Sequence, residues 1–99
     1  MAATQRPRPE EKLEIPEGTP EFYVDSVNVG TQLYSSTMWL GTLREGRPPL
    51  VKVIIKMSPP MTKVVSLILS KHIREYETDI GPIKIPKTLY HSLGLEEYI

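Results

Sequence analysis

Residues 57–83 constrain the fold most, because they carry the one unambiguous helical pattern in the chain. Ser58 is a favourable N-cap, since its hydroxyl can accept a hydrogen bond from the free N–H groups of the first turn. Pro59 and Pro60 suit the first helical positions, where a missing N–H costs nothing and φ is already helical. Gly81, followed directly by a proline, supplies the stop. We therefore expect a helix from about Pro59 to about Asp79.

The apolar residues of this segment recur at steps of three and four and cover roughly half of the helix circumference. We call this set the apolar stripe: Met61, Val64, Val65, Ile68, Leu69, Ile73, Tyr76 and Ile80. His72 lies near the middle of the stripe, so we expect it to be a buried polar group, a neutral histidine bonded to a carbonyl or a water. The alternative is a pH-sensitive or ligand-facing histidine, since imidazole titrates close to neutrality.

Three strands are predicted upstream of the helix, at residues 21–29, 34–44 and 50–57. All three are rich in β-branched and aromatic residues. Residues 30–32 form the first turn, and the proline-containing segment 45–49 forms the second loop. Short connections between consecutive strands favour an antiparallel meander. The predicted class is α+β, a three-stranded antiparallel meander followed by one long helix (β-β-β-α) and a short C-terminal helix at residues 87–93.

Alternation along the third predicted strand separates two faces of the sheet. One face carries Val51, Val53, Ile55 and Met57, and we expect the long helix to cover it. The other face carries Trp39, Leu43 and Ile54 beside Leu50, Lys52 and Lys56. So much apolar surface is unfavourable in water. We therefore expect a second copy of the chain to cover this second face, with Trp39, Leu43 and Ile54 in the oligomer interface. A homodimer is the commonest closed arrangement.

A chain of 99 residues makes one domain with a modest core. Residues 1–20 contain four prolines among charged residues and are predicted to form an extended arm. The arm is either a solvated tail or lies across a neighbouring subunit through Leu13 and Ile15. Residues 21–83 form the β-β-β-α domain. Residues 84–99 form a C-terminal tail that docks on its own core or on the partner.

The charges balance, with 12 Lys and Arg against 12 Asp and Glu. This balance argues against a general polyanion binder, whose affinity rests on excess basic charge. The absence of cysteine excludes disulfides and thiol chemistry. No stretch resembles a signal peptide or is long enough to cross a bilayer. We expect a soluble, cytoplasmic protein without a membrane partner.

No set of residues in the sequence amounts to a catalytic or metal site. A nucleophile–base pair would have to combine Ser35, Ser36 or Thr37 with His72 or His91, and no spacing brings them together. There is no glycine-rich phosphate loop, zinc spacing or paired-carboxylate motif. We therefore expect a non-enzymatic binding or scaffolding protein with no cofactor.

The alternative function is single-stranded nucleic-acid binding on the sheet. Aromatic side chains could stack on bases while basic side chains contact phosphates. The residues for this role are Tyr23, Tyr34, Trp39, Arg44, Arg47, Lys52 and Lys56. The simpler interpretation is that the lysines keep an outer strand face solvated.

The segment I-I-K-M-S-P, joining the last strand to the helix, resembles a family of short uncharacterised bacterial and archaeal proteins grouped as a domain of unknown function. The resemblance covers about residues 21–83 and follows the pattern I-I-x-M-[ST]-P…K…I-x-x-Y-E-x-x-x-G-x-I. The matching residues are Met57, Ser58, Pro59, Lys63, Ile73, Tyr76, Glu77, Gly81 and Ile83. Thr62 and His72 depart from it, where members tend to have Ala and Asn. Residues 37–41 lack the acidic residues that members tend to carry, so no role for those carboxylates transfers. The resemblance implies the fold but no established activity.

Overall fold

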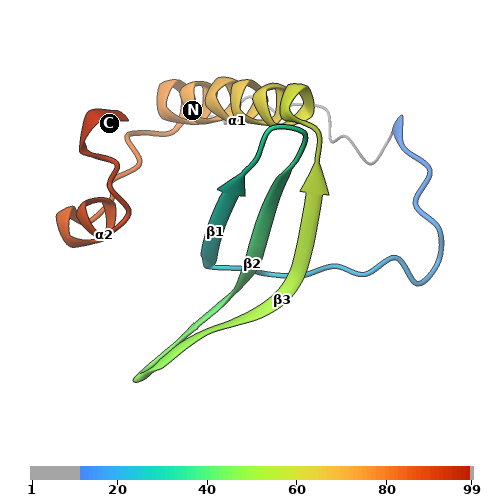
Figure 1. Ribbon diagram of the computed structural model, residues 1–99. Coiled ribbons are helices and arrows are strands. Elements are labelled where there is room, and N and C mark those ends of the chain that lie inside the picture. The colour runs from blue at the N-terminus through green and yellow to red at the C-terminus, as the bar shows by residue number, and fades with distance from the viewer. Residues whose placement is uncertain (1–11, 99) are drawn as a thin grey trace. The chain divides into compact units, whose positions relative to one another are not determined.

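The computed structural model describes residues 12–98 of the chain. Three strands, β1 (Ser26–Thr31), β2 (Ser36–Arg44) and β3 (Arg47–Met57), precede the long helix α1 (Pro59–Asp79). The short helix α2 (Lys87–Ser92) and the 3-10 helix η2 (Glu96–Tyr98) follow (Figure 1). The predicted α+β class with a β-β-β-α order is confirmed.

The described residues divide into two compact units, and the boundary lies inside α1 between Leu69 and Ser70. The first unit holds the sheet and the beginning of α1. The second unit holds the rest of α1, α2 and η2.

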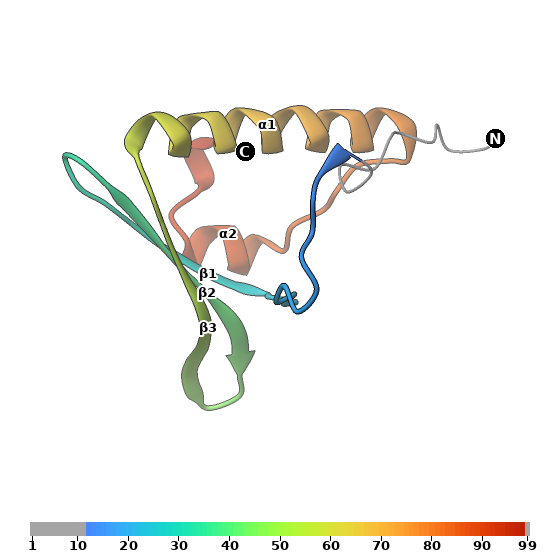
Figure 2. The same ribbon diagram turned by 90° about the vertical axis from the view of Figure 1, so that its right-hand side faces the viewer.

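The sheet has the strand order β1-β2-β3, and both pairings are antiparallel. Figures 1 and 2 show that β3 passes into α1 at the same end of the sheet as the turn between β1 and β2. In that turn the N–H of Gln32 donates to the carbonyl of Ser35 over 2.8 Å. At the opposite end the β2–β3 hairpin continues beyond β1, since β1 pairs only with Ser36 to Gly41 of β2.

The strand boundaries differ from the predicted ones. The ladder of β1 begins at Ser26, so Phe22 and Tyr23 precede the sheet, and β2 begins at Ser36. The loop before β3 is shorter than predicted, because β3 includes both prolines of the segment. Proline is tolerated there because β3 is an edge strand, where a missing N–H need not interrupt a ladder.

A β-bulge changes the predicted faces of β3. Leu40 pairs with Val53, but Gly41 pairs with Val51, which leaves Lys52 as the extra residue of β3. The prediction that Val51 shares a face with Val53 is therefore wrong. Val51 lies opposite Gly41, on the side of Trp39, and Leu50 moves to the side of Val53.

Gly41 is required at the bulge because the two strands approach very closely. A Cβ atom on Gly41 would lie 1.9 Å from the carbonyl oxygen of Leu50 and 2.7 Å from its carbonyl carbon. Nearby, the backbone N–H of Leu43 donates to Asp25 Oδ1 over 2.8 Å, so a carboxylate takes the place of a ladder partner. The amide of Asp25 in turn donates to the Gly41 carbonyl over 2.9 Å.

Both helices begin and end as predicted, within one residue. The N–H of Met61 donates to Ser58 Oγ over 3.3 Å, which makes Ser58 the N-cap of α1. After α1, the N–H groups of Ile80 and Gly81 both donate to the Tyr76 carbonyl. Gly94 follows α2 with a φ of 69°, as a glycine stop requires.

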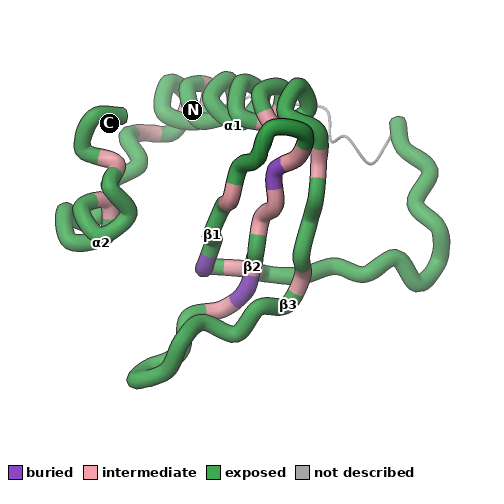
Figure 3. The backbone as a smooth tube through the Cα atoms, in the orientation of Figure 1, coloured by how far each residue is buried: buried purple, intermediate pink, exposed green. Residues whose placement is uncertain are grey.

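Residues 12–98 contain no buried apolar side chain, and their only buried residues are Ser26, Ser36 and Gly41 (Figure 3). No residue of α1 is buried. Ile55, on the sheet face that the helix is expected to cover, is 38% exposed, and that cover stays a prediction. His72, in the second unit, is exposed there, and its role as a buried polar group stays a prediction.

Candidate self-association surfaces

One face of the sheet is mainly aliphatic across all three strands. Residues directly opposite each other in an antiparallel pair share a face, and the register joins Val29 to Met38 and Met38 to Ile55. We call this set the aliphatic face: Val27, Val29, Met38, Leu40, Leu50, Val53 and Ile55. None of these seven residues is charged, and Val29 is 56% exposed. Thr42, opposite Leu50, and Ser36, opposite Met57, add hydroxyl groups to the same side of the sheet.

The opposite side, the tryptophan face, mixes apolar and basic residues. Trp39 lies opposite Asn28 on β1 and Ile54 on β3. Alternation adds Leu43, Lys52 and Lys56 to this face. The predicted interface residues Trp39, Leu43 and Ile54 therefore share one side of the sheet, and all three are exposed. Their role in an interface stays a prediction.

Trp39 already has a partner inside the sheet. A Cβ atom on Gly30 would lie 3.2 Å from the Trp39 ring, so the indole lies over the bare glycine backbone. This packing across the strands holds the exposed fraction of Trp39 to 37%.

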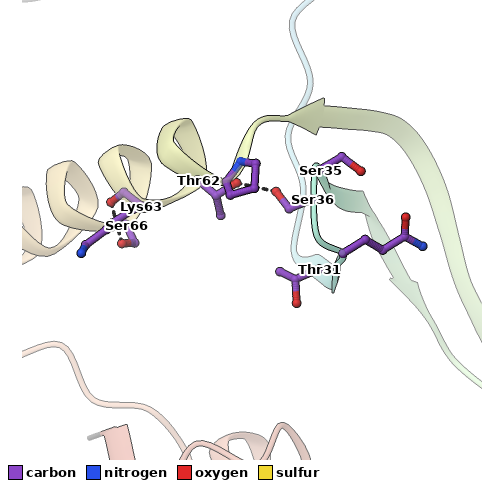
Figure 4. A pocket seen from close by; sticks show the side chains of 8 residues that line it. Thr31, Ser35, Ser36, Thr62, Lys63 and Ser66 are labelled. Carbon is purple, nitrogen blue, oxygen red and sulfur yellow. Dashed lines mark hydrogen bonds between the residues drawn. The ribbon is translucent and has the colours of Figure 1, made fainter.

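The first turns of α1 turn a polar side toward their own sheet. A cavity of about 260 Å³ lies between the β1–β2 turn and this side of α1 (Figure 4). Its lining residues are Thr31, Gln32, Ser35, Ser36, Pro59, Thr62, Lys63 and Ser66. Ser36 Oγ and Thr62 Oγ1 are hydrogen-bonded. Because Thr62 Oγ1 donates its own hydrogen to the Ser58 carbonyl over 2.9 Å, Ser36 is the donor of the bond between the two hydroxyls.

This cavity is not equipped to bind an anion at the helix N-terminus. Pro59 and Pro60 have no N–H, and the next two N–H groups, of Met61 and Thr62, are both taken by Ser58. Lys63 is the only charged residue in the lining. Ser36 and Thr62 therefore act as a structural clasp between β2 and α1. The clasp was not predicted from the sequence, where its one signal is the hydroxyl of Thr62 in the first turn of the helix.

The residues considered for nucleic-acid contacts fall into separate groups. Lys52 and Lys56 share the tryptophan face with Trp39. Arg44 and Arg47 face each other at the far end of the β2–β3 hairpin, roughly 30 Å of strand away from Lys56. Arg44 donates from Nε and a terminal nitrogen to the Pro48 carbonyl over 3.0 and 2.9 Å, which engages its guanidinium locally.

Tyr23 and Tyr34 lie outside the strands, before β1 and in the β1–β2 turn, and are 80% and 85% exposed. The structure thus brings only Trp39, Lys52 and Lys56 together on one sheet face.

In the second unit, His91 belongs to a shallow cavity of about 380 Å³ that Lys87, Thr88, Tyr90 and Glu96 also line. Its Nδ1 lies 2.6 Å from Glu96 Oε1, and both side chains are well exposed. His91 is thus a surface residue, as predicted.

Across residues 12–98, no three side chains of histidine, cysteine, aspartate or glutamate gather where they could hold a metal ion. In the same part of the chain, no helix combines the length and the apolar content that a membrane crossing needs.

Comparison with protein-family models, with curated proteins and with solved structures finds no match to this chain. The resemblance to a family of unknown function therefore stays a prediction.

Proposed function

We propose that this chain is a non-enzymatic homo-oligomeric binding or scaffolding protein whose copies cover one another's apolar surfaces. One observation carries the proposal: among the residues that the structure describes, no apolar side chain is buried. Full burial of one aliphatic or aromatic side chain contributes about 1.5–3 kcal/mol, and such burial is the main favourable term in folding. Most residues of the aliphatic face and the apolar stripe are only about half buried, so the chain gains only part of that term.

A second copy of the chain can cover these exposed apolar side chains without any other protein. A twofold axis brings the same surfaces of two chains into contact, and this symmetry is the commonest among oligomers. A small domain with a thin core gains most from such pairing. The tryptophan face, expected from the sequence to form the interface, and the aliphatic face are the two sheet surfaces available for it.

The solution mass tests this proposal. A monomer has a mass of 11.3 kDa, and we expect sedimentation or native mass spectrometry to give a multiple of it at micromolar concentration. The matched variants Ile55→Glu and Trp39→Glu place one carboxylate on each sheet face, and Lys52→Glu controls for added negative charge. A folded wild-type monomer at these concentrations would remove the proposal.

Single-stranded nucleic-acid binding is the second candidate, because the register places Trp39 opposite Ile54, whose neighbours on the same side are Lys52 and Lys56. We place nucleic-acid binding after self-association because the net charge is balanced, whereas affinity for a polyanion rests on excess basic charge. The chain contains one tryptophan, so its fluorescence reports directly on this face. Quenching by a single-stranded oligonucleotide at low salt, lost as salt rises, is the expected signature of binding. Unchanged fluorescence and unchanged mobility with micromolar protein would exclude it.

A further inference from the structure

We infer that the tryptophan face binds one nucleotide of a single strand between the indole of Trp39 and the ammonium group of Lys56, and that Gly30 makes room for the indole. This inference rests on the second candidate function and names the residues that contact the base and the phosphate. All three residues belong to the unit that holds the sheet.

Gly30 is required by the indole and not by the backbone of β1. Its φ is not positive, so the strand conformation at this position accepts any residue. The atoms that an added Cβ would meet are Cζ3 and Cη2 of Trp39, at 3.2 and 3.3 Å. Alanine would therefore fit the strand but push the ring away. The bare backbone of Gly30 lets the outer edge of the indole reach across from β2 to β1.

The indole of Trp39 is held in place without being covered. Trp39 keeps 37% of its surface exposed, and its cross-strand neighbours Asn28 and Ile54 are exposed too. A ring that is already positioned by a neighbouring strand loses little further conformational freedom when it binds a ligand. Stacking of a base on such an aromatic side chain is tolerant of sequence, because every base has a π-face.

Lys56 lies in the same cross-strand row as the edge of the indole. Gly30 pairs with Thr37, and Thr37 pairs with Lys56, so the three residues share one face. Neighbouring strands are about 4.8 Å apart, which places the backbones of Gly30 and Lys56 about 10 Å apart. The lysine stem is flexible and carries its charge at the end. A base stacked on the indole can therefore have its phosphate at Lys56.

The charge of the sheet suits a polyanion, although the charges of the whole chain balance. None of the three strands contains an acidic residue. Residues 26–69 include five basic residues and one acidic residue, Glu45, which lies in the turn between β2 and β3. Lys52 adds a second ammonium group on the tryptophan face, about 13 Å along β3 from Lys56. A single-stranded nucleic acid has both the negative charge and the aromatic rings that this face can bind.

Anisotropy of two fluorescently labelled strands tests the inference. A short oligothymidylate presents bases and phosphates, and an abasic strand of the same length presents the phosphates without bases. We expect the wild-type chain at low salt to bind oligothymidylate at least about fivefold more tightly than the abasic strand, since stacking on an aromatic side chain strengthens binding by at least that factor per base.

Variants of the full chain separate stacking from charge, and circular dichroism first establishes that each is folded. We expect Gly30→Ala and Trp39→Leu to remove most of the fivefold preference and to leave the salt dependence unchanged. Lys56→Gln should keep the preference but reduce the slope of log affinity against log salt by about 0.7, the contribution of one phosphate contact on a single strand. Arg47→Gln removes the same charge at the far end of the β2–β3 hairpin and should change neither quantity.

Three outcomes would overturn the inference while leaving the second candidate function in place. These are equal affinity of the wild type for the two strands, full preference in a folded Gly30→Ala, and an equal loss of slope in Arg47→Gln and Lys56→Gln. If the wild type at micromolar concentration binds neither strand, nucleic-acid binding is excluded together with this inference. The solution mass, which tests self-association, is a separate measurement that none of these outcomes changes.

Discussion

The two faces of the sheet differ in the polarity of the side chains that surround their apolar residues. Ile55 on the aliphatic face is 38% exposed, and Trp39 on the tryptophan face is 37% exposed. The tryptophan face carries two lysines, and its indole already packs on Gly30. None of the seven residues of the aliphatic face is charged. Exposed fraction alone therefore does not identify a contact surface, and the polarity of the neighbouring side chains separates the two faces.

The change Gly41→Ala should have the largest effect, because it breaks the bulge at which the two faces exchange residues of β3. The added Cβ would lie 1.9 Å from the Leu50 carbonyl oxygen, and backbone must move to relieve that overlap. We expect a loss of about 3 kcal/mol or more in the free energy of unfolding, at or above the upper range for overpacking. Chemical denaturation followed by circular dichroism measures this loss.

Gly30→Ala is the control for Gly41→Ala within the same sheet. Its Cβ would meet only the Trp39 ring at 3.2 Å, and a side chain can shift where backbone cannot. Equal losses for the two variants would mean that the close approach at Gly41 is relaxed in solution.

The variants Ile55→Glu and Trp39→Glu compare the two faces directly. We expect Ile55→Glu to weaken association by about 2 kcal/mol or more, roughly 30-fold in Kd, because the carboxylate enters a contact without charged partners. We expect Trp39→Glu to cost less, because Lys52 and Lys56 lie on its own face and keep it partly solvated. Sedimentation equilibrium gives both constants. An equal or larger effect of Trp39→Glu would make the tryptophan face the principal contact, as predicted from the sequence.

The helix boundaries were predictable because their causes are local. Ser58, Pro59 and Gly81 act through hydrogen bonds and φ values within a few residues of themselves. The bulge was not predictable, since it is a property of the pairing between two strands. One extra residue in β3 inverted the assignment of Leu50 and Val51.

The residues on each candidate surface were predictable only in part, because the bulge depends on the pairing between two strands. Trp39 and Leu43 were assigned to one side by alternation along β2, and the extra residue at the bulge lies in β3, so their assignment was unaffected. Ile54 lies on the C-terminal side of the bulge and also kept its face. The cover expected from the helix stays a prediction, because periodicity shows that a stripe is apolar and does not show what the stripe packs on.

The smallest effect is expected at the clasp between β2 and the first turn of α1. Thr62→Val removes the bond to Ser36 together with the bond from Thr62 Oγ1 to the Ser58 carbonyl. Thr78→Val is a matched control, since Thr78 Oγ1 makes the same kind of bond to the Arg74 carbonyl over 2.9 Å and no other hydrogen bond is described for that hydroxyl. We expect Thr62→Val to lower the free energy of unfolding by about 1 kcal/mol more than Thr78→Val, the contribution of one hydrogen bond. Denaturation of both variants at one protein concentration measures the difference. If the two variants are equally stable, the hydrogen bond between Ser36 and Thr62 does not contribute to the stability of the fold.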